Sequence, residues 1–360
     1  MTTPRPFIAN GLATLIGSLP VADHGEALGI IFSHTPAVPL WPQLPVNPKE
    51  GMLNQFVEGF PGVVEEGDRT YFNVHTEQFP ADQLAFFERY LAAMESPEAL
   101  AASSFAVSRE RGRGLYELCD LAKGRDGIVA LKGQITGPFT LLTGLMDENK
   151  RLGYYEPAIH EVAVKGLALK AAWQAQMLGQ IGKPTIVFID EPALAGLGSS
   201  SFITMSLEEI GQDLTEVIEA IHQAGGLAGI HVCANTDWEF LLSLPLDILS
   251  FDAYSFFERL IVCKEQLYAF LDRGGILAWG IVPTSEKEQI DRESADSLTA
   301  RWEEQADQLA NARWDKARLL RQTLVTPSCG TGSLPLPYAT KVLALTRDVS
   351  AALRGRYLAA

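Results

Sequence analysis

Short apolar runs alternate with longer amphipathic segments from one end of the chain to the other. This alternation is typical of a parallel α/β fold, in which each buried strand is followed by a helix that covers it. The apolar runs predict eight strands, at Thr14–Pro20, Ala37–Pro42, Ile128–Gly133, Thr185–Asp190, Leu227–His231, Ile248–Asp252, Ile276–Val282 and Leu324–Pro327. Eight strands with crossover helices predict a (β/α)8 TIM barrel that occupies residues 1–360 as one domain.

The segments between the predicted strands include clear amphipathic helices, such as Leu207–Gln223 and Glu288–Arg313. The span 43–126, between the second and third strands, is far longer than a normal crossover and is expected to be an insertion. It contains the stretch "TYFNVH" and two expected helices, Ala81–Met94 and Pro97–Arg111. A lid over the barrel mouth and a purely structural appendage are both open for this insertion.

Composition narrows the classes of partner. A formal net charge of −15 argues against nucleic acid, because that affinity depends on clustered Lys and Arg. No apolar run approaches the roughly 20 residues of a membrane span, and the mildly apolar N-terminal stretch is better explained as the first strand than as a signal peptide. The 4 cysteines are scattered without a dense framework, which favours a reducing compartment, the cytoplasm.

Polar residues that close the predicted strands are the candidate site, because barrel chemistry sits at the carboxyl ends of strands. Residues i and i+2 of a strand point the same way, so His231 and Cys233 can present an imidazole and a thiolate to one point. Asp252 and Cys329 follow other strands at the same mouth, and the four side chains suit tetrahedral zinc. The alternative is a buried His beside a buried Cys. Cys119 and Cys263, within helical stretches, are expected to be packing residues.

The donor set indicates what such a zinc site would do. Zinc hydrolases surround the metal with neutral imidazoles, whose residual positive charge lowers the pKa of bound water to about 7. Two thiolates and a carboxylate leave the centre with a negative formal charge, which makes it a poor Lewis acid. It can still bind a substrate thiol as a nucleophilic thiolate. The expected chemistry is therefore alkylation of a thiol.

Six short motifs in order along the chain carry a family resemblance: "IGSLP", "ITGPFTLL", "IDEPAL", "HVC", "FDAY" and "PSCG". With them the chain resembles the catalytic barrel of cobalamin-independent methionine synthase, within the group that also holds uroporphyrinogen decarboxylase and methylcobamide:coenzyme M methyltransferases. The resemblance spans nearly the whole chain and implies a zinc-dependent methyltransferase that converts homocysteine to methionine.

The resemblance also implies residue roles. His231, Cys233 and Cys329 match zinc ligands that act in catalysis, and Asp252 stands where the family has Glu. The remaining matches concern the amino acid substrate. Ile16, Gly17 and Ser18 match a segment that holds its carboxylate, and Asp190 matches an acid that binds its ammonium group. Gln43 stands near the place of a neighbouring acid of the family, which this chain replaces. An acid that merely caps the next helix is the alternative for Asp190.

Two departures from the family concern the methyl donor. The folate-dependent enzymes carry an additional amino-terminal half, and this chain has room for one barrel. Their loop after strand seven holds a His thought to help protonate the departing folate nitrogen, whereas this chain reads "WGIVPTSEKE" there. Methylcobalamin needs no such acid, since cobalt departs as cob(I). Both departures point to a methylcorrinoid donor, presented by a separate corrinoid protein.

Three other functions remain open. The first is the same methyl transfer to another thiol such as coenzyme M, although an acid at Asp190 suits an ammonium group better than a sulfonate. The second is uroporphyrinogen decarboxylase-like chemistry, which uses Arg residues, and none lies near the end of the first strand. The third is a non-enzymatic zinc-binding or corrinoid-binding accessory protein.

Overall fold

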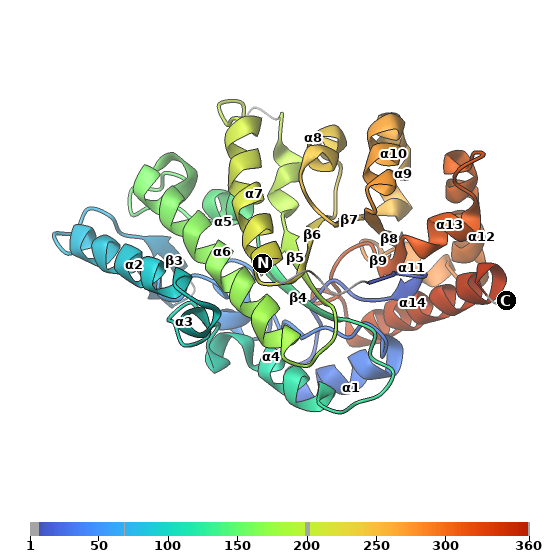
Figure 1. Ribbon diagram of the computed structural model, residues 1–360, viewed down its shortest axis with the longest axis horizontal. Coiled ribbons are helices and arrows are strands. Elements are labelled where there is room, and N and C mark those ends of the chain that lie inside the picture. Colours follow the sequence, from blue (N-terminus) through green and yellow to red (C-terminus); the bar gives the residue numbers. More distant parts are fainter. Residues whose placement is uncertain (1–6, 68, 199–201, 359–360) are drawn as a thin grey trace.

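A single seven-stranded parallel sheet forms the centre of the computed structural model, which describes residues 7–67, 69–198 and 202–358 (Figure 1). In sheet order the strands are β1 (Leu12–Ala13), β9 (Thr323–Pro327), β8 (Ile276–Val282), β7 (Ile248–Phe251), β6 (Leu227–Val232), β5 (Thr185–Asp190) and β4 (Leu131–Thr136). The sheet curls into a half-barrel compatible with a TIM-like fold. Predicted strands therefore exist at six of the eight expected places, with bounds that differ by at most three residues.

The second predicted strand, Ala37–Pro42, forms an isolated bridge instead of a strand. Leu40 bridges Lys132 of β4, and Gln43, directly after the segment, bridges Ser18 in the loop that follows β1, the strand at the other edge of the sheet. The segment holds two prolines, which have no N–H to give to a ladder, so continuous pairing cannot form.

The first predicted strand, Thr14–Pro20, begins where β1 ends. Thr14 still donates its amide to Val325, at 3.1 Å, and the chain then leaves β9. Ser18 pairs across to Gln43 instead. The residues that follow β1 therefore form a loop at the carboxyl end of the sheet.

Helices surround the convex side of the sheet (Figure 1). They are α1 (His24–His34), α2 (Phe79–Met94), α3 (Pro97–Ala101), α4 (Arg109–Ala122), α5 (Pro138–Gly144), α6 (Pro157–Gly179), α7 (Leu207–Gln223), α8 (Trp238–Ser243), α9 (Ala253–Leu260), α10 (Lys264–Asp272), α11 (Lys287–Arg292), α12 (Ala295–Leu309), α13 (Lys316–Arg321) and α14 (Leu336–Tyr357). Four short 3-10 helices join them, η1 (Pro48–Glu50), η2 (Gly153–Tyr155), η3 (Pro192–Gly196) and η4 (Ile261–Cys263). No helix among the described residues is long and apolar enough to cross a membrane.

Two expected helices are each divided in two. Glu288–Arg313 breaks between α11 and α12, because Ser294 forms a capping box with Ser297 and so starts a new helix. Pro97–Arg111 becomes α3 and the start of α4. Leu207–Gln223 matches α7 at both ends, as expected for a strongly amphipathic segment.

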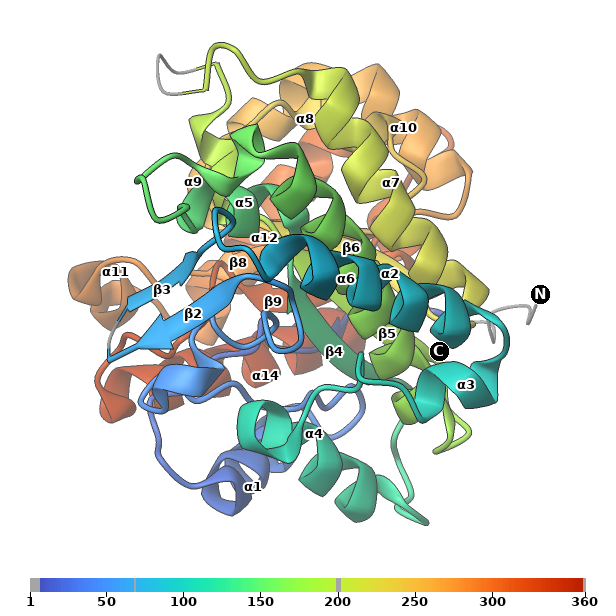
Figure 2. The ribbon, with the colours of Figure 1, turned by 90° about the vertical axis from the view of Figure 1, so that its left-hand side faces the viewer.

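The inserted span 43–126 adds a two-stranded hairpin and three helices. The hairpin pairs β2 (Val63–Glu66) with β3 (Arg69–Phe72), and α2 and α3 pack on α6 while α4 packs on α1 (Figure 2). Most of the insertion thus covers the outside of the sheet. Its first residues, from Gln43 to Met52, lie instead at the carboxyl ends of the strands and line the cavity described below.

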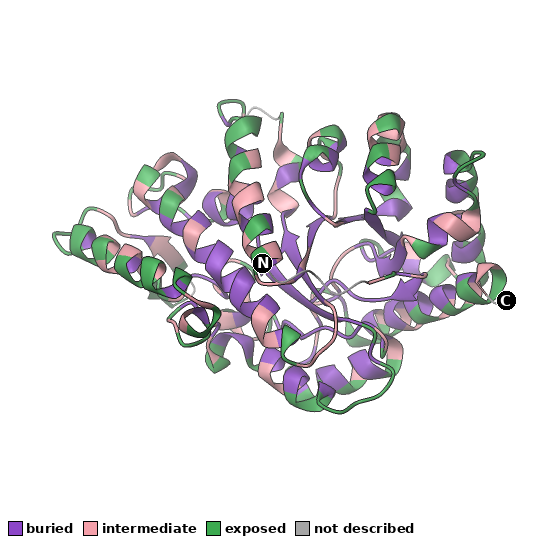
Figure 3. Ribbon diagram, viewed as in Figure 1, coloured by how far each residue is buried: buried purple, intermediate pink, exposed green. Residues whose placement is uncertain are grey.

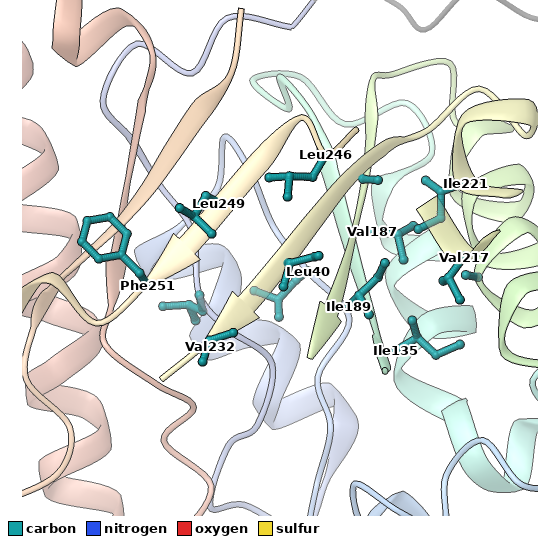
Figure 4. Close-up of a cluster of buried hydrophobic side chains, with 14 of the residues drawn as sticks. Leu40, Ile135, Val187, Ile189, Val217, Ile221, Val232, Leu246, Leu249 and Phe251 are labelled. Atoms are coloured by element: carbon teal, nitrogen blue, oxygen red, sulfur yellow. The ribbon is translucent and has the colours of Figure 1, made fainter. Parts of the chain in front are cut away.

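The central strands are buried on both faces (Figure 3), and their side chains point alternately into two apolar layers. Outward-facing strand residues such as Val187, Ile189 and Leu249 join the large core under the helices (Figure 4). The alternate residues form a second, smaller cluster that joins Leu12 of β1 to Ile186 of β5. Those strands are far apart in the sheet order, so this contact requires the sheet to be curled around the smaller cluster.

Glu191 links two of the sequence motifs. Its carboxylate, directly after β5, accepts the amides of Phe139 and Thr140 at 2.9 and 2.8 Å and the Thr140 hydroxyl at 2.6 Å. These donors lie in the first turn of α5, where backbone amides have no intrahelical partner. "IDEPAL" therefore fixes the position of "ITGPFTLL" through one buried carboxylate.

We expect Glu191→Gln to lower the free energy of unfolding by about 1–3 kcal/mol, because the amide NH2 would face amide donors and leave one unsatisfied. Chemical denaturation of the purified variant measures this change. Glu77→Gln, at an exposed position, is the control and should stay within about 0.5 kcal/mol of the wild type. Equal stability of the two variants would contradict the capping role.

Candidate metal centre

Three potential metal ligands meet at the carboxyl ends of β6 and β9. His231 lies in β6, Cys233 follows its last residue, and Cys329 follows β9 after one intervening residue. One imidazole nitrogen and the two sulfur atoms all lie within 4.8 Å of one another. Within the described ranges, this is the one group of three or more His, Cys, Asp or Glu side chains close enough to share an ion.

Ser250 orients the His231 ring. Nδ1 of His231 lies 2.9 Å from Oγ of Ser250, whereas the buried Nε2 has no hydrogen-bond partner among the described residues. When Nδ1 carries the proton and donates to Ser250, Nε2 keeps a free lone pair. A hydrogen bond on one ring nitrogen and a free second nitrogen is the usual arrangement of a metal-binding histidine.

The two cysteines are coupled. The two sulfurs lie within 4.8 Å of each other, and their interaction lowers the pKa of Cys233 and raises that of Cys329. The lowered pKa favours the thiolate form of Cys233, and thiolates are the form that ligates metals.

Asp252, the fourth predicted ligand, lies outside the group of three. Its carboxylate caps α9, where Oδ1 accepts the Ser255 amide at 2.9 Å, and burial raises its pKa. Asp252 shares the inner face of the sheet with His231, because Ser250, two residues before it, pairs with His231 in the register. Direct ligation by Asp252 stays a prediction.

A cavity of about 350 Å³ adjoins the three ligands. Four of the five residues expected to bind substrate also line this cavity, namely Ile16, Ser18, Gln43 and Asp190. The other described residues that line it are Pro45, Glu50, Met52, Pro192, Gly330, Gly332 and Ser333. No Lys or Arg is present among these lining residues.

The loop after β1 leaves backbone donors available beside the cavity, among them two consecutive amides. Among the hydrogen bonds of the described residues, the amides of Gly17 and Ser18 have no acceptor, whereas their carbonyls accept from Gln43 and Thr331. Gly17 does not line the cavity itself, but a Cβ there would lie 2.6 Å from Oε1 of Gln43. The close approach explains the glycine, and the two free N–H groups can bind an anion such as a carboxylate.

Asp190 supplies a buried carboxylate oxygen that accepts no hydrogen bond from the described residues. It closes β5 with 4% of its surface exposed, and its Oδ1 has no hydrogen-bond partner among the described residues. Burial raises its pKa to about 6, and the buried Lys132 opposes that rise. Asp190 does not cap the following helix, η3, which has no side-chain cap, and Glu191 beside it accepts the first-turn amides of α5 instead. A buried acceptor in a cavity suits a ligand that carries hydrogen-bond donors.

The structure adds a second acid that the sequence analysis missed. Glu50 in η1 lines the cavity with 1% of its surface exposed, and its carboxylate is held by His24 at 2.8 Å and by the Leu44 amide at 3.0 Å. Gln43, which lines the same wall, donates to Gln55 at 2.6 Å. No strand pattern surrounds Glu50, so the sequence carries no signal that would bring it to the site.

The side chains present fit zinc. A tetrahedral centre with Zn–S bonds of about 2.3 Å keeps its ligand atoms roughly 4 Å apart, close to the observed limit of 4.8 Å. A metal requires a free ring nitrogen, which Nε2 of His231 offers, and a thiolate, which the lowered pKa of Cys233 favours. Two thiolates would neutralise Zn²⁺, so the arrangement suits thiol binding better than activation of water.

Comparison with known proteins neither extends nor corrects this description. No protein-family model matches the chain, and no curated protein matches it significantly.

We expect the wild type to bind one zinc ion per chain, and Cys233→Ser and Cys329→Ser each to lose at least nine-tenths of that zinc, because each removes one of the three ligands. Elemental analysis after dialysis against a weak chelator measures the content. Cys263→Ser is the matched control, because Cys263 lies in η4 outside the ligand group and is half-buried against the core. Full zinc retention by either ligand variant would remove that residue from the site.

Proposed function

We propose that the protein is a zinc-dependent methyltransferase that methylates homocysteine to methionine, as the family resemblance implies. The observation that carries the proposal is the shared cavity, where two thiol ligands and an imidazole lie beside two buried acids and two free backbone amides. In this proposal the segment 37–43 completes an eight-stranded barrel, supported by its bridges to both sheet edges.

The amino acid end of the substrate determines the choice among thiols. Asp190 and Glu50 are suited to an ammonium group, and the amides of Gly17 and Ser18 are suited to a carboxylate. Coenzyme M carries a sulfonate and no ammonium group, and uroporphyrinogen carries several carboxylates. Neither finds a Lys or Arg among the described lining residues, so homocysteine is the better match.

The reaction is a transfer of CH3⁺ from a methylcorrinoid to sulfur. Zinc, when bound, would lower the pKa of the substrate thiol and keep the sulfur nucleophilic. The S–CH3 bond forms as the Co–CH3 bond breaks, the cobalt keeps the electron pair as cob(I), and the thiol proton passes to solvent. Asp190 and Glu50 hold the amino group, and the Gly17 and Ser18 amides hold the carboxylate, so that the sulfur lies toward the cysteines.

We expect zinc-loaded protein to demethylate methylcobalamin with homocysteine and not with coenzyme M. Asp190→Asn should lower kcat/KM for homocysteine by roughly 10- to 100-fold, because a charge-assisted hydrogen bond is lost. Asp296→Asn, exposed on α12, is the control and should match the wild type. The assay follows the corrinoid absorption and quantifies methionine.

Other outcomes of this assay separate the alternatives. Turnover confined to coenzyme M would contradict the homocysteine assignment and favour the sister branch. Zinc binding without turnover for either thiol would favour an accessory protein. Equal activity of Asp190→Asn and the wild type would remove Asp190 from substrate binding.

A further inference from the structure

A fully buried lysine lies below the substrate loop and has no part in the proposed reaction. Lys132 of β4 is 0% exposed, and its ammonium group donates to the carbonyl of Ile16 at 2.5 Å and to Oε1 of Gln134 at 3.3 Å. It also lies over the ring of Phe188, 4.3 Å from the centroid. Lysine is almost never fully buried without partners, so these contacts require an explanation.

The bond to Ile16 fixes one peptide unit. The described chain contains no cis peptide bonds, so the N–H of Gly17 points opposite to the carbonyl of Ile16. With that carbonyl held by Lys132, the Gly17 N–H is directed away from the lysine. It has no acceptor among the described residues, and neither has the next amide, that of Ser18.

Gln134 extends this support to the neighbouring segment. It donates to the carbonyl of Trp41 at 2.9 Å, and a Cβ on Gly17 would lie 3.2 Å from its Cδ. Lys132 and Gln134 therefore connect the loop after β1 with the segment that bridges both sheet edges. The loop that carries the free amides rests directly on this polar pair.

We propose that Lys132 is a positioning residue that holds the 16–17 peptide so that the Gly17 and Ser18 amides bind the carboxylate of an α-amino acid thiol. This inference rests on the proposed function. A cationic donor on the Ile16 carbonyl polarises the peptide and strengthens its N–H as a donor. The described lining of the cavity offers a carboxylate no Lys or Arg, so Lys132 supplies positive charge indirectly.

The test compares two thiols that differ in the carboxylate. Cobalt(II)-substituted protein is titrated with homocysteine and with 3-aminopropane-1-thiol, which lacks the carboxylate, and the thiolate-to-cobalt absorption band reports binding without turnover. We expect Lys132→Met to weaken homocysteine binding at least tenfold and to change binding of the amine thiol less than twofold. Lys170→Met is the matched control, because Lys170 is 1% exposed, lies on α6 and contacts Phe60. It should leave both affinities unchanged.

Thiol binding by the wild-type protein separates a failure of the proposed function from a failure of the inference about Lys132. A wild type that binds neither thiol overturns the proposed function, and this inference with it. If the wild type binds homocysteine, two results overturn the inference alone. Either Lys132→Met binds homocysteine as tightly as the wild type does, or Lys132→Met loses affinity for both thiols to the same extent. Circular dichroism and cobalt stoichiometry check that each variant folds. If Lys132→Met does not fold, Lys132→Gln keeps a donor without the charge and should weaken homocysteine selectively by about threefold or more.

Discussion

The parallel register of β5, β6 and β7 is the constraint on which the rest of the site depends. Asp190 pairs with His231, and His231 pairs with Ser250, so all three lie in one row on the inner face of the sheet. Because side chains alternate along a strand, Cys233 and Asp252 follow on the same face one step nearer the carboxyl ends. A shift of one residue would move the whole set into the apolar layer under the helices.

Charge balance inside the curled sheet follows from that register. Acidic groups are concentrated near the mouth, at Cys233, Asp190 and Glu50. Lys132 lies beneath them on β4, where burial lowers its pKa to about 7 and Asp190 opposes that change. A divalent cation at the cysteines would offset the thiolate charge, which is the electrostatic reason to expect a metal there.

Sequence reasoning succeeded where a local pattern determines the structure. The apolar runs of β5 and β8 have the predicted bounds, and the i, i+2 spacing of His231 and Cys233 correctly placed both at one strand end. The prolines near Leu40 prevented a regular strand there, because a hydrophobic run does not report missing N–H donors. Glu50 could not be found, because its position depends on how a long insertion folds back.

For Lys132 and Ser250, the sequence predicts the position of the side chain but not its partner. Both lie inside predicted strands, and their alternation with apolar neighbours would place them on the inner face. What the sequence does not contain is the partner of each side chain, the Ile16 carbonyl for one and the His231 ring for the other. These contacts form only when distant segments close around the sheet.

Zinc K-edge X-ray absorption of the zinc-loaded protein, with and without homocysteine, tests the central claim most directly. The account predicts two sulfur neighbours at about 2.3 Å and one imidazole nitrogen, with a third sulfur when homocysteine is added. A sulfur count that does not change with homocysteine, or a zinc shell without sulfur, would contradict a thiol-activating centre at His231, Cys233 and Cys329.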